Sequence, residues 1–261
     1  MSTPAPTPPD ARAYDLSVVA PAHNEAGNLT PLRSQIRAAF AATGLRVQVV
    51  LVNDGSTDTT AQELQSLAQH DPDLTAFHHE TPRGQSAALR SGIAAAAAPL
   101  LATLDADLQN DPADLPAMVK LLSERRADLV QGDRTAHRCD HAGRRAASAV
   151  GRLFRRVLLH DPVRDTGCAT RVMRTDLARR LPLAREGMHR FIPACAAALG
   201  GRVVETHVNH RPRHAGHTKY GTGVLTRGLP GLRGCFFVRR LQRRSAAPAV
   251  SPRPRAKPGH A

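Results

Sequence analysis

Short apolar runs alternate with amphipathic segments through the first half of the chain, and this alternation most restricts the possible fold. Leu16–Ala20 precedes a helix-like stretch from about Asn28 to Ala42, and Val47–Val52 precedes one that opens with the possible capping residues Ser56 and Thr57. The order repeats twice more before a last apolar run, which ends at Asp133. Repeated β-α units predict an α/β fold with a mostly parallel central sheet flanked by helices.

The second half has a different pattern. We predict an Arg-rich helix over about 141–159, a turn and an edge strand within 165–174, a helix over about 188–199, and a strand over 202–210. The stretch 223–244 is predicted to form a broken amphipathic helix. The expected organisation is a disordered N-terminal arm (1–13), one domain (14–223, with halves 14–133 and 134–223), a basic amphipathic segment (224–244) and a disordered basic tail (245–261).

Positive charge is concentrated in the last third of the chain. The net charge is +14, and from Leu177 onward 17 Lys and Arg accompany only two acids, Glu186 and Glu205. Such a segment is expected to bind an anionic surface, either phospholipid or nucleic acid. The four cysteines form no CxxC pair, and no stretch resembles a signal peptide or a membrane span. We therefore expect a soluble, cytoplasmic chain.

Polar motifs follow four of the predicted strands. They are Pro21–Glu25, Asn53–Asp58, Arg83–Gly92 and Asp105–Gln109. Each has an ordinary explanation alone, since Asn-Asp-Gly-Ser is a common turn and Asp-x-Asp is usually a solvated strand end. The carboxyl ends of parallel strands share one edge of a sheet, where ligands gather. Four such motifs at one edge therefore indicate a binding site.

In combination, five motifs carry a resemblance to a known family. They are "SVVAPAHNEAGNL", "VVLVNDGSTDTT", "LDADLQNDP", "DTGCATRVMR" and "RPRHAGHTKYG". Over roughly Asp15 to Leu241 the chain resembles family 2 glycosyltransferases of the GT-A fold, and within them the polyprenyl-phosphate sugar transferases. The resemblance implies an inverting enzyme that moves one sugar from a GDP- or UDP-linked donor to undecaprenyl or dolichyl phosphate.

The resemblance also implies a donor site. Pro21, Asn24 and Glu25 would line the nucleoside pocket, Asp54 and Ser56 would contact base or ribose, and Arg83 and Gly84 would close over the nucleotide.

A metal site is implied next to the donor site. Asp105, Asp107 and Gln109 match the metal positions, and Asp105 also belongs to the donor site. Alternation would place the three side chains on one side of an extended segment, and hard Mg²⁺ or Mn²⁺ prefers such oxygen ligands. The ion would stabilise charge on the departing nucleoside diphosphate. Asp111 and Asp114 are expected to serve helix capping and the surface.

A phosphorylated lipid acceptor would account for the many arginines. It is already an anion and needs a positive clamp rather than a general base. By resemblance, Arg134, Arg144, Ser148, Arg213 and Lys219 match acceptor-phosphate positions, although a solvated basic face remains the alternative for the helix. Asp165 would join Asp107 and Arg134 near the reaction centre, or else form an Asp–Arg pair with Arg171 that braces a turn.

The segment 224–244 is expected to lie on the inner face of the cell membrane. Gly228, Pro230, Gly231 and Gly234 interrupt any span, whereas Phe236, Phe237, Val238 and Leu241 among arginines suit the headgroup plane.

Two alternatives stay open. A saccharide hydroxyl acceptor would require a carboxylate base, and a non-catalytic nucleic-acid-binding protein would draw on the basic tail. We expect no specific nucleic acid partner, because aromatic stacking residues are missing from the basic region.

Overall fold

The structure is a computed structural model that describes residues 14–135, 159, 163–211 and 224–245, with side chains in the last range described from 232 to 243. The predicted N-terminal arm, the tail beyond 245, and four proposed acceptor-phosphate residues lie outside these ranges. Those four residues are Arg144, Ser148, Arg213 and Lys219.

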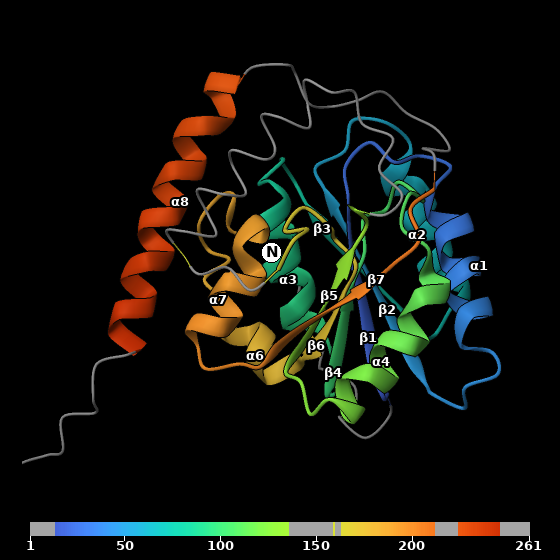
Figure 1. The fold of residues 1–261 in the computed structure, drawn as a ribbon. Coiled ribbons are helices and arrows are strands. Elements are labelled where there is room, and N and C mark those ends of the chain that lie inside the picture. Colours follow the sequence, from blue (N-terminus) through green and yellow to red (C-terminus); the bar gives the residue numbers. More distant parts are fainter. Residues whose placement is uncertain (1–13, 136–158, 160–162, 212–223, 246–261) are drawn as a thin grey trace, which may run out of the picture.

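The described strands form one seven-stranded sheet in the order β3-β2-β1-β4-β6-β5-β7 (Figure 1). β1 is parallel to β2 and β4, β2 is parallel to β3, and β5 is parallel to β7. The mostly parallel sheet predicted from the alternating pattern is therefore confirmed. The strands are β1 (Leu16–Ala22), β2 (Val47–Asp54), β3 (Leu74–His79), β4 (Leu100–Thr103), β5 (Leu129–Asp133), β6 (Arg171–Arg174) and β7 (Val203–His207).

The position of β6 corrects one prediction. The "DTGCATRVMR" segment was expected to end in an edge strand, but β6 lies inside the sheet and pairs antiparallel with both β4 and β5. Its first three residues are buried, which agrees with a strand covered on both faces. Because β6 joins the two halves, the segment that begins at Asp165 lies close to the carboxyl end of β4.

Helices cover both faces of the sheet. Packing against one face are α1 (Leu29–Phe40), α2 (Thr60–His70) and α4 (Leu115–Glu124), and against the other α3 (Gln85–Ala95), α6 (Thr175–Arg180) and α7 (Ile192–Ala198). The helix α8 (Val224–Ser245) lies outside α7, and two short 3₁₀ turns are η1 (Pro112–Asp114) and η3 (Met188–Phe191). The prediction of helices on both faces is confirmed.

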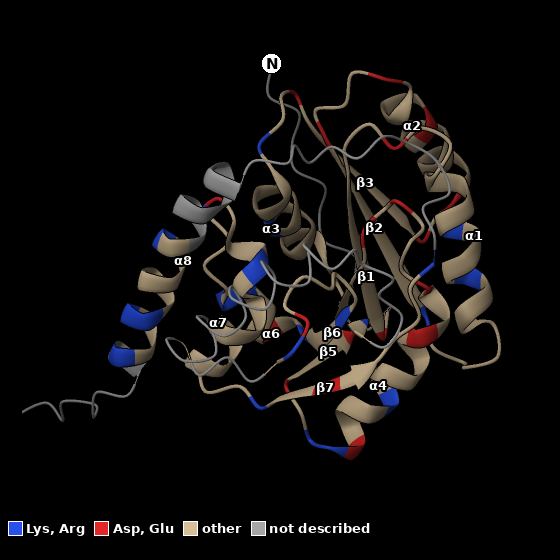
Figure 2. Ribbon diagram, turned by 45° about the horizontal axis from the view of Figure 1, so that its top comes forward, with Lys and Arg blue, Asp and Glu red and all other residues tan. Residues whose placement is uncertain are grey.

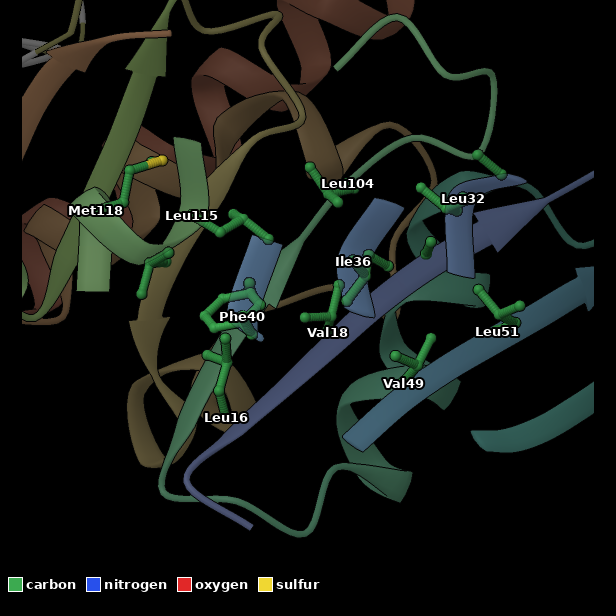
Figure 3. Packing of buried hydrophobic residues seen from close by; sticks show 14 of the residues in the cluster. Leu16, Val18, Leu32, Ile36, Phe40, Val49, Leu51, Leu104, Leu115 and Met118 are labelled. Carbon is green, nitrogen blue, oxygen red and sulfur yellow. The ribbon is translucent and has the colours of Figure 1, made fainter. Parts of the chain in front are cut away.

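Alternation along β1 builds two separate cores. Leu16 and Val18 face α1 and α4, where Ile36, Phe40 and Met118 are buried against them (Figure 3). Val19, the residue after Val18, belongs to the other core, with residues of α3, α6 and α7. A strand buried on both faces is a continuous apolar run, which is the pattern in the sequence.

The helix α8 is continuous, which corrects the expectation of a broken helix. It runs for 22 residues through Pro230 and several glycines. Val238 was expected in the headgroup plane, but it is fully buried against the domain. Gly234 allows this close packing, because a Cβ there would lie 2.4 Å from Cε2 of Phe191. Phe191 is itself a core residue.

Within the residues that the structure describes, no helix combines the length and apolarity that crossing a bilayer requires.

Candidate active site

The loops after β1 and β2 are hydrogen-bonded into one unit at the carboxyl edge of the sheet. The backbone N–H of Asn24 donates to Oγ of Ser56 (2.9 Å), and the N–H of Thr57 donates to Oδ1 of Asn24 (2.8 Å). The N–H of Glu25 donates to Oγ1 of Thr60 (2.8 Å). Asn24 has a left-handed φ of +52°, a conformation that asparagine tolerates. Three residues expected in the donor site, Asn24, Glu25 and Ser56, therefore lie together.

Asp54 holds the loop that follows β3. Its carboxylate accepts the backbone N–H groups of Arg83 and Gly84, each at 2.8 Å, and lies 2.7 Å from Nδ1 of His79. The other ring nitrogen of His79 lies 3.0 Å from Oγ of Ser91. Burial alone would raise the pKa of Asp54, but the hydrogen bonds from His79 and the two amides hold it below the ordinary value. The carboxylate thus positions the predicted nucleotide-covering loop.

Gly55 allows this loop to approach β2. It has a φ of +62°, and a Cβ at this position would lie 2.4 Å from the backbone nitrogen of Pro82. Nearby, Nδ1 of His23 lies 2.8 Å from the carbonyl oxygen of Asp54, while Pro21 is half-buried in β1. Except for Asp105, which follows β4, the residues expected to form the donor site therefore lie at the ends of β1 and β2 and on the loops after β1, β2 and β3.

The Asp-x-Asp segment forms a turn, which corrects the expectation of an extended segment. β4 ends at Thr103, and Leu108 has a left-handed φ of +61° with its side chain buried. The backbone N–H of Gln109 donates to Oδ1 of Asp107 at 3.2 Å. Simple alternation therefore does not decide where the side chains of 105, 107 and 109 point. The buried Leu108 fixes the turn, since it ties the loop to the core.

Negative charge accumulates at Asp105. Burial and the neighbouring Asp107 raise the pKa of Asp105 to about 6, while Arg171 and Arg134 oppose the rise. Oδ1 of Asp105 accepts a hydrogen bond from Nε2 of Gln85 at 2.8 Å. Carboxylate oxygens crowded in this way fit the donor preference of Mg²⁺ or Mn²⁺. In the described ranges, no group of three or more His, Cys, Asp or Glu side chains is arranged to hold a metal ion.

Arg134 and Asp165 form a buried ion pair beside the carboxylates. Nε of Arg134 lies 2.8 Å from Oδ2 of Asp165, and Nη2 lies 3.3 Å from Oδ1. The side chains are 11% and 2% exposed. The pair explains why the pKa of Arg134 is raised despite its burial. An Asp–Arg pair does brace this turn, but the arginine is Arg134 rather than the expected Arg171.

Arg171 is a buried cation behind the site. Its Nε donates to Oε1 of Gln131 at 2.8 Å, and its two Nη groups donate to the carbonyl oxygens of Ala169 and Thr166, each at 3.5 Å. Burial lowers the pKa of Arg171, and the negative charge of Asp105 opposes that effect. Neutral hydrogen-bond acceptors therefore orient the guanidinium, and its positive charge interacts with the carboxylate of Asp105.

The start of α3, directly after the loop expected to cover the nucleotide, is hydrogen-bonded to the second half of the chain. Oγ of Ser86 lies 2.9 Å from Nδ1 of His189 and accepts the backbone N–H of His189 at 3.0 Å. Burial and the nearby Arg190 and Arg171 lower the pKa of His189 to about 3. The imidazole is therefore neutral at physiological pH and adds no charge to the site.

The sequence motifs indicate no role for His79, Gln85 or His189. His79 carried a usable signal, since it is a polar residue at the carboxyl end of a parallel strand. Gln85 contacts Asp105 from the start of α3, whereas His189 contacts Ser86 because α3 and η3 pack together. On the adjoining segment, Asp111 accepts the N–H of Ala113, which confirms its expected capping role.

Comparison with known proteins defines the class of this fold and site. Residues 17–181 match the family model "Glycosyl transferase family 2". The chain belongs to glycosyl transferase family 2. Glucosyl-3-phosphoglycerate synthase from Mycobacterium tuberculosis, solved with UDP, superposes with a TM-score of 0.66 at 20% identity, covering 90% of this chain and 87% of that one. A structure of the same synthase with Mn²⁺, UDP and phosphoglyceric acid gives 0.65 at 20% identity, covering 92% and 82%. These likenesses show the GT-A fold.

Curated relatives are more similar in sequence. Dodecaprenyl-phosphate galacturonate synthase of Rhizobium johnstonii is 34% identical over 241 residues, which cover 89% of this chain and 70% of that protein. Undecaprenyl-phosphate 4-deoxy-4-formamido-L-arabinose transferase of Edwardsiella ictaluri is 32% identical over 228 residues, covering 87% and 69%. The chain is thus a glycosyltransferase whose relatives are named for polyprenyl-phosphate products.

Proposed function

We propose that this enzyme transfers one sugar, with inversion, from a nucleoside-diphosphate sugar to a polyprenyl phosphate, with Mg²⁺ or Mn²⁺ as cofactor. The observation that carries the proposal is the pair Asp105 and Asp107 beside the donor loops, in a chain whose curated relatives are named for polyprenyl-phosphate products. The donor is GDP- or UDP-linked. UDP is the first to test, because solved structures of this fold hold it.

On the donor side, the chain supplies a preorganised edge. The loop unit of Asn24 and Ser56 would receive the nucleoside, and the loop at Arg83 and Gly84 would cover it. Asp54 keeps that second loop in place through two backbone hydrogen bonds. Loops that are fixed before the donor arrives lose less conformational entropy on binding.

Asp105 and Asp107, with the amide of Gln109, would hold the divalent cation. When bound, the cation supplies electrophilic stabilisation of the leaving diphosphate. Since the described residues offer two close carboxylates rather than three ligands of that kind, diphosphate oxygens and water would complete the coordination. Gln85 would keep Asp105 oriented toward the donor edge through its 2.8 Å hydrogen bond.

On the acceptor side, an anionic phosphate needs positive charge more than a base. Arg134 and Arg171 supply fixed positive charge behind the acidic loop, and Asp165 orients Arg134. Because Arg134 is committed to Asp165, the acceptor clamp is proposed to rest also on Arg144, Ser148, Arg213 and Lys219, on the strength of their motifs.

We place the enzyme at the cytoplasmic face of the membrane, with the outer face of α8 against anionic lipid. Leu232 and Phe236 are 42% and 65% exposed on this face, and Arg233 and Arg243 are exposed beside them. Apolar side chains that dip between headgroups, together with arginines that pair with lipid phosphates, give reversible peripheral binding.

The testing experiment is a matrix of UDP- and GDP-sugars against undecaprenyl and dolichyl phosphate, in detergent, with Mg²⁺, Mn²⁺ or EDTA. We expect transfer with one nucleotide class, dependent on the cation. Free polyprenol and a soluble oligosaccharide are the matched acceptors without a phosphate. Equal turnover with either of them, or full activity in excess EDTA, would refute the proposed chemistry.

A further inference from the structure

A hollow of about 220 Å³ lies between α8 and the segment that joins α6 to η3. Its lining combines two arginines, Arg185 and Arg240, with the apolar Phe237 and Leu241. Phe237 and Leu241 are four residues apart and so share one side of α8, and both are only half-buried. The hollow is separate from the donor edge, because none of its lining residues belongs to the loops that follow β1 to β4.

The guanidinium of Arg185 lies over the ring of Phe237 and has no anionic partner among the described residues. Its Cζ lies 4.5 Å from the centroid of the Phe237 ring, a cation–π contact. A guanidinium stacked on a ring still presents its N–H groups at its edge, where they can contact a phosphate. Among the described residues, neither Arg185 nor Arg240 forms a side-chain hydrogen bond or an ion pair, and the exposed Glu186 pairs with neither.

The surroundings of the hollow favour a lipid over a free anion. The sequence of α8 contains six arginines and no acid, and Figure 2 shows basic positions along its described part. Phe236 directly precedes Phe237 and lies roughly 100° around the helix on the exposed face. A ligand with a phosphate at the arginines and hydrocarbon against Phe237 and Leu241 would complement both parts of the lining.

We propose that this hollow binds the headgroup of an anionic phospholipid, its phosphate between Arg185 and Arg240 and its glycerol and first methylenes on Phe237 and Leu241. The inference deepens the proposed membrane contact of α8 and rests on it. It adds a defined headgroup site to a contact that otherwise depends on general charge and on exposed apolar side chains.

The test uses dihexanoyl phosphatidylglycerol below its micelle concentration, so that no membrane is present. Arginine Nε–H signals are followed by NMR during titration of the full chain. We expect saturable shifts of the Arg185 and Arg240 signals, and about tenfold weaker binding in Arg185→Gln and in Arg240→Gln. Arg243→Gln is the matched control, because it removes the same charge from the outer face of α8, and it should bind as the parent does.

Two further ligands decide the source of the phosphate. Dihexanoyl phosphatidylcholine, whose choline neutralises the phosphate, and inorganic phosphate, which has no hydrocarbon, should each bind at least about tenfold more weakly. Equal binding of either ligand, or equal losses in Arg243→Gln and the two hollow variants, would overturn the headgroup site.

A sugar-transfer assay distinguishes the proposed headgroup site from the proposed transferase function. In detergent, Arg185→Gln and Arg240→Gln should transfer sugar to polyprenyl phosphate as the parent does. Transfer without phosphatidylglycerol binding would remove the headgroup site alone, whereas binding without transfer to any polyprenyl phosphate would remove the proposed function alone.

Discussion

Nδ1 of His79 lies 2.7 Å from Oδ1 of Asp54, and this buried pair fixes the loop that would cover the nucleotide. Replacing His79 by Ala leaves the carboxylate with its two backbone amides but without its lateral support. We expect the KM for the nucleotide sugar to rise about tenfold with little change in kcat, because a charge-assisted hydrogen bond contributes about 1.5–3 kcal/mol. Steady-state kinetics measures the split.

Ser91→Ala is the control for that prediction, since it removes only the distal hydrogen bond of the ring. A kcat loss in His79→Ala with an unchanged KM would contradict a positioning role for His79.

Asp107→Asn should reduce kcat/KM by about two orders of magnitude or more while the fold is retained, because it removes one of the two carboxylates proposed to hold the cation. Asp111→Asn is a suitable control, since Asp111 caps η1 on the same segment. Circular dichroism reports the fold and turnover reports the chemistry. Full activity of Asp107→Asn would remove the metal role.

The raised pKa of Asp105 predicts that the metal-free protein loses stability as the pH rises from 3.8 to about 6. Its pKa is raised from 3.8 to about 6, so the folded state binds more protons than the unfolded state between these values. This contribution is complete below pH 3.8 and is lost as the pH rises through about 6, by about 3 kcal/mol at most. Denaturant unfolding in EDTA, at a series of pH values, measures the change.

Addition of Mg²⁺ or Mn²⁺ above pH 6 should restore that stability, because the cation replaces the proton between the carboxylates. In Asp105→Asn the free energy of unfolding should change much less between about pH 4 and pH 6. An equal change in the parent and in the variant would contradict the raised pKa of Asp105.

Gly234→Ala should loosen α8 from the domain, because the new Cβ would lie 2.4 Å from the ring of Phe191. We expect a loss of about 1–3 kcal/mol in the free energy of unfolding, as for other overpacked sites. Limited proteolysis of α8 and thermal unfolding report the effect. Phe191→Leu in the same chain should recover part of the loss, whereas Arg233→Ala on the outer face should have no effect.

The sequence predicted the parallel part of the fold, because strands such as Val47–Val52 are continuous apolar runs between periodic helices. The interior position of β6 could not be predicted in the same way. Its two antiparallel neighbours, β4 and β5, lie 68 and 38 residues upstream, counted from Arg171 to Thr103 and Asp133. Strand partners of this kind are chosen by tertiary packing, which a local pattern does not contain.

At the site, the motifs located the loops but not their internal geometry. The left-handed conformation of Leu108 interrupts the expected alternation of side chains from 105 to 109. A leucine in the sequence does not indicate such a conformation. Gln85 contacts Asp105 from the start of α3, so its role depends on how two separate β-α units pack. The partner of Asp165 was missed for a similar reason, since Arg134 lies 31 residues away.

The hydrogen bonds between Ser86 and His189 join the start of α3, next to the loop proposed to cover the nucleotide, to η3, which packs against the helix proposed to lie on the membrane. Ser86 is the second residue of α3, directly after the loop at Arg83 and Gly84, and Phe191, two residues after His189, is the side chain against which Gly234 of α8 packs. The short turn η3 is therefore shared by two elements: it supports α8 through Phe191 and the start of α3 through His189.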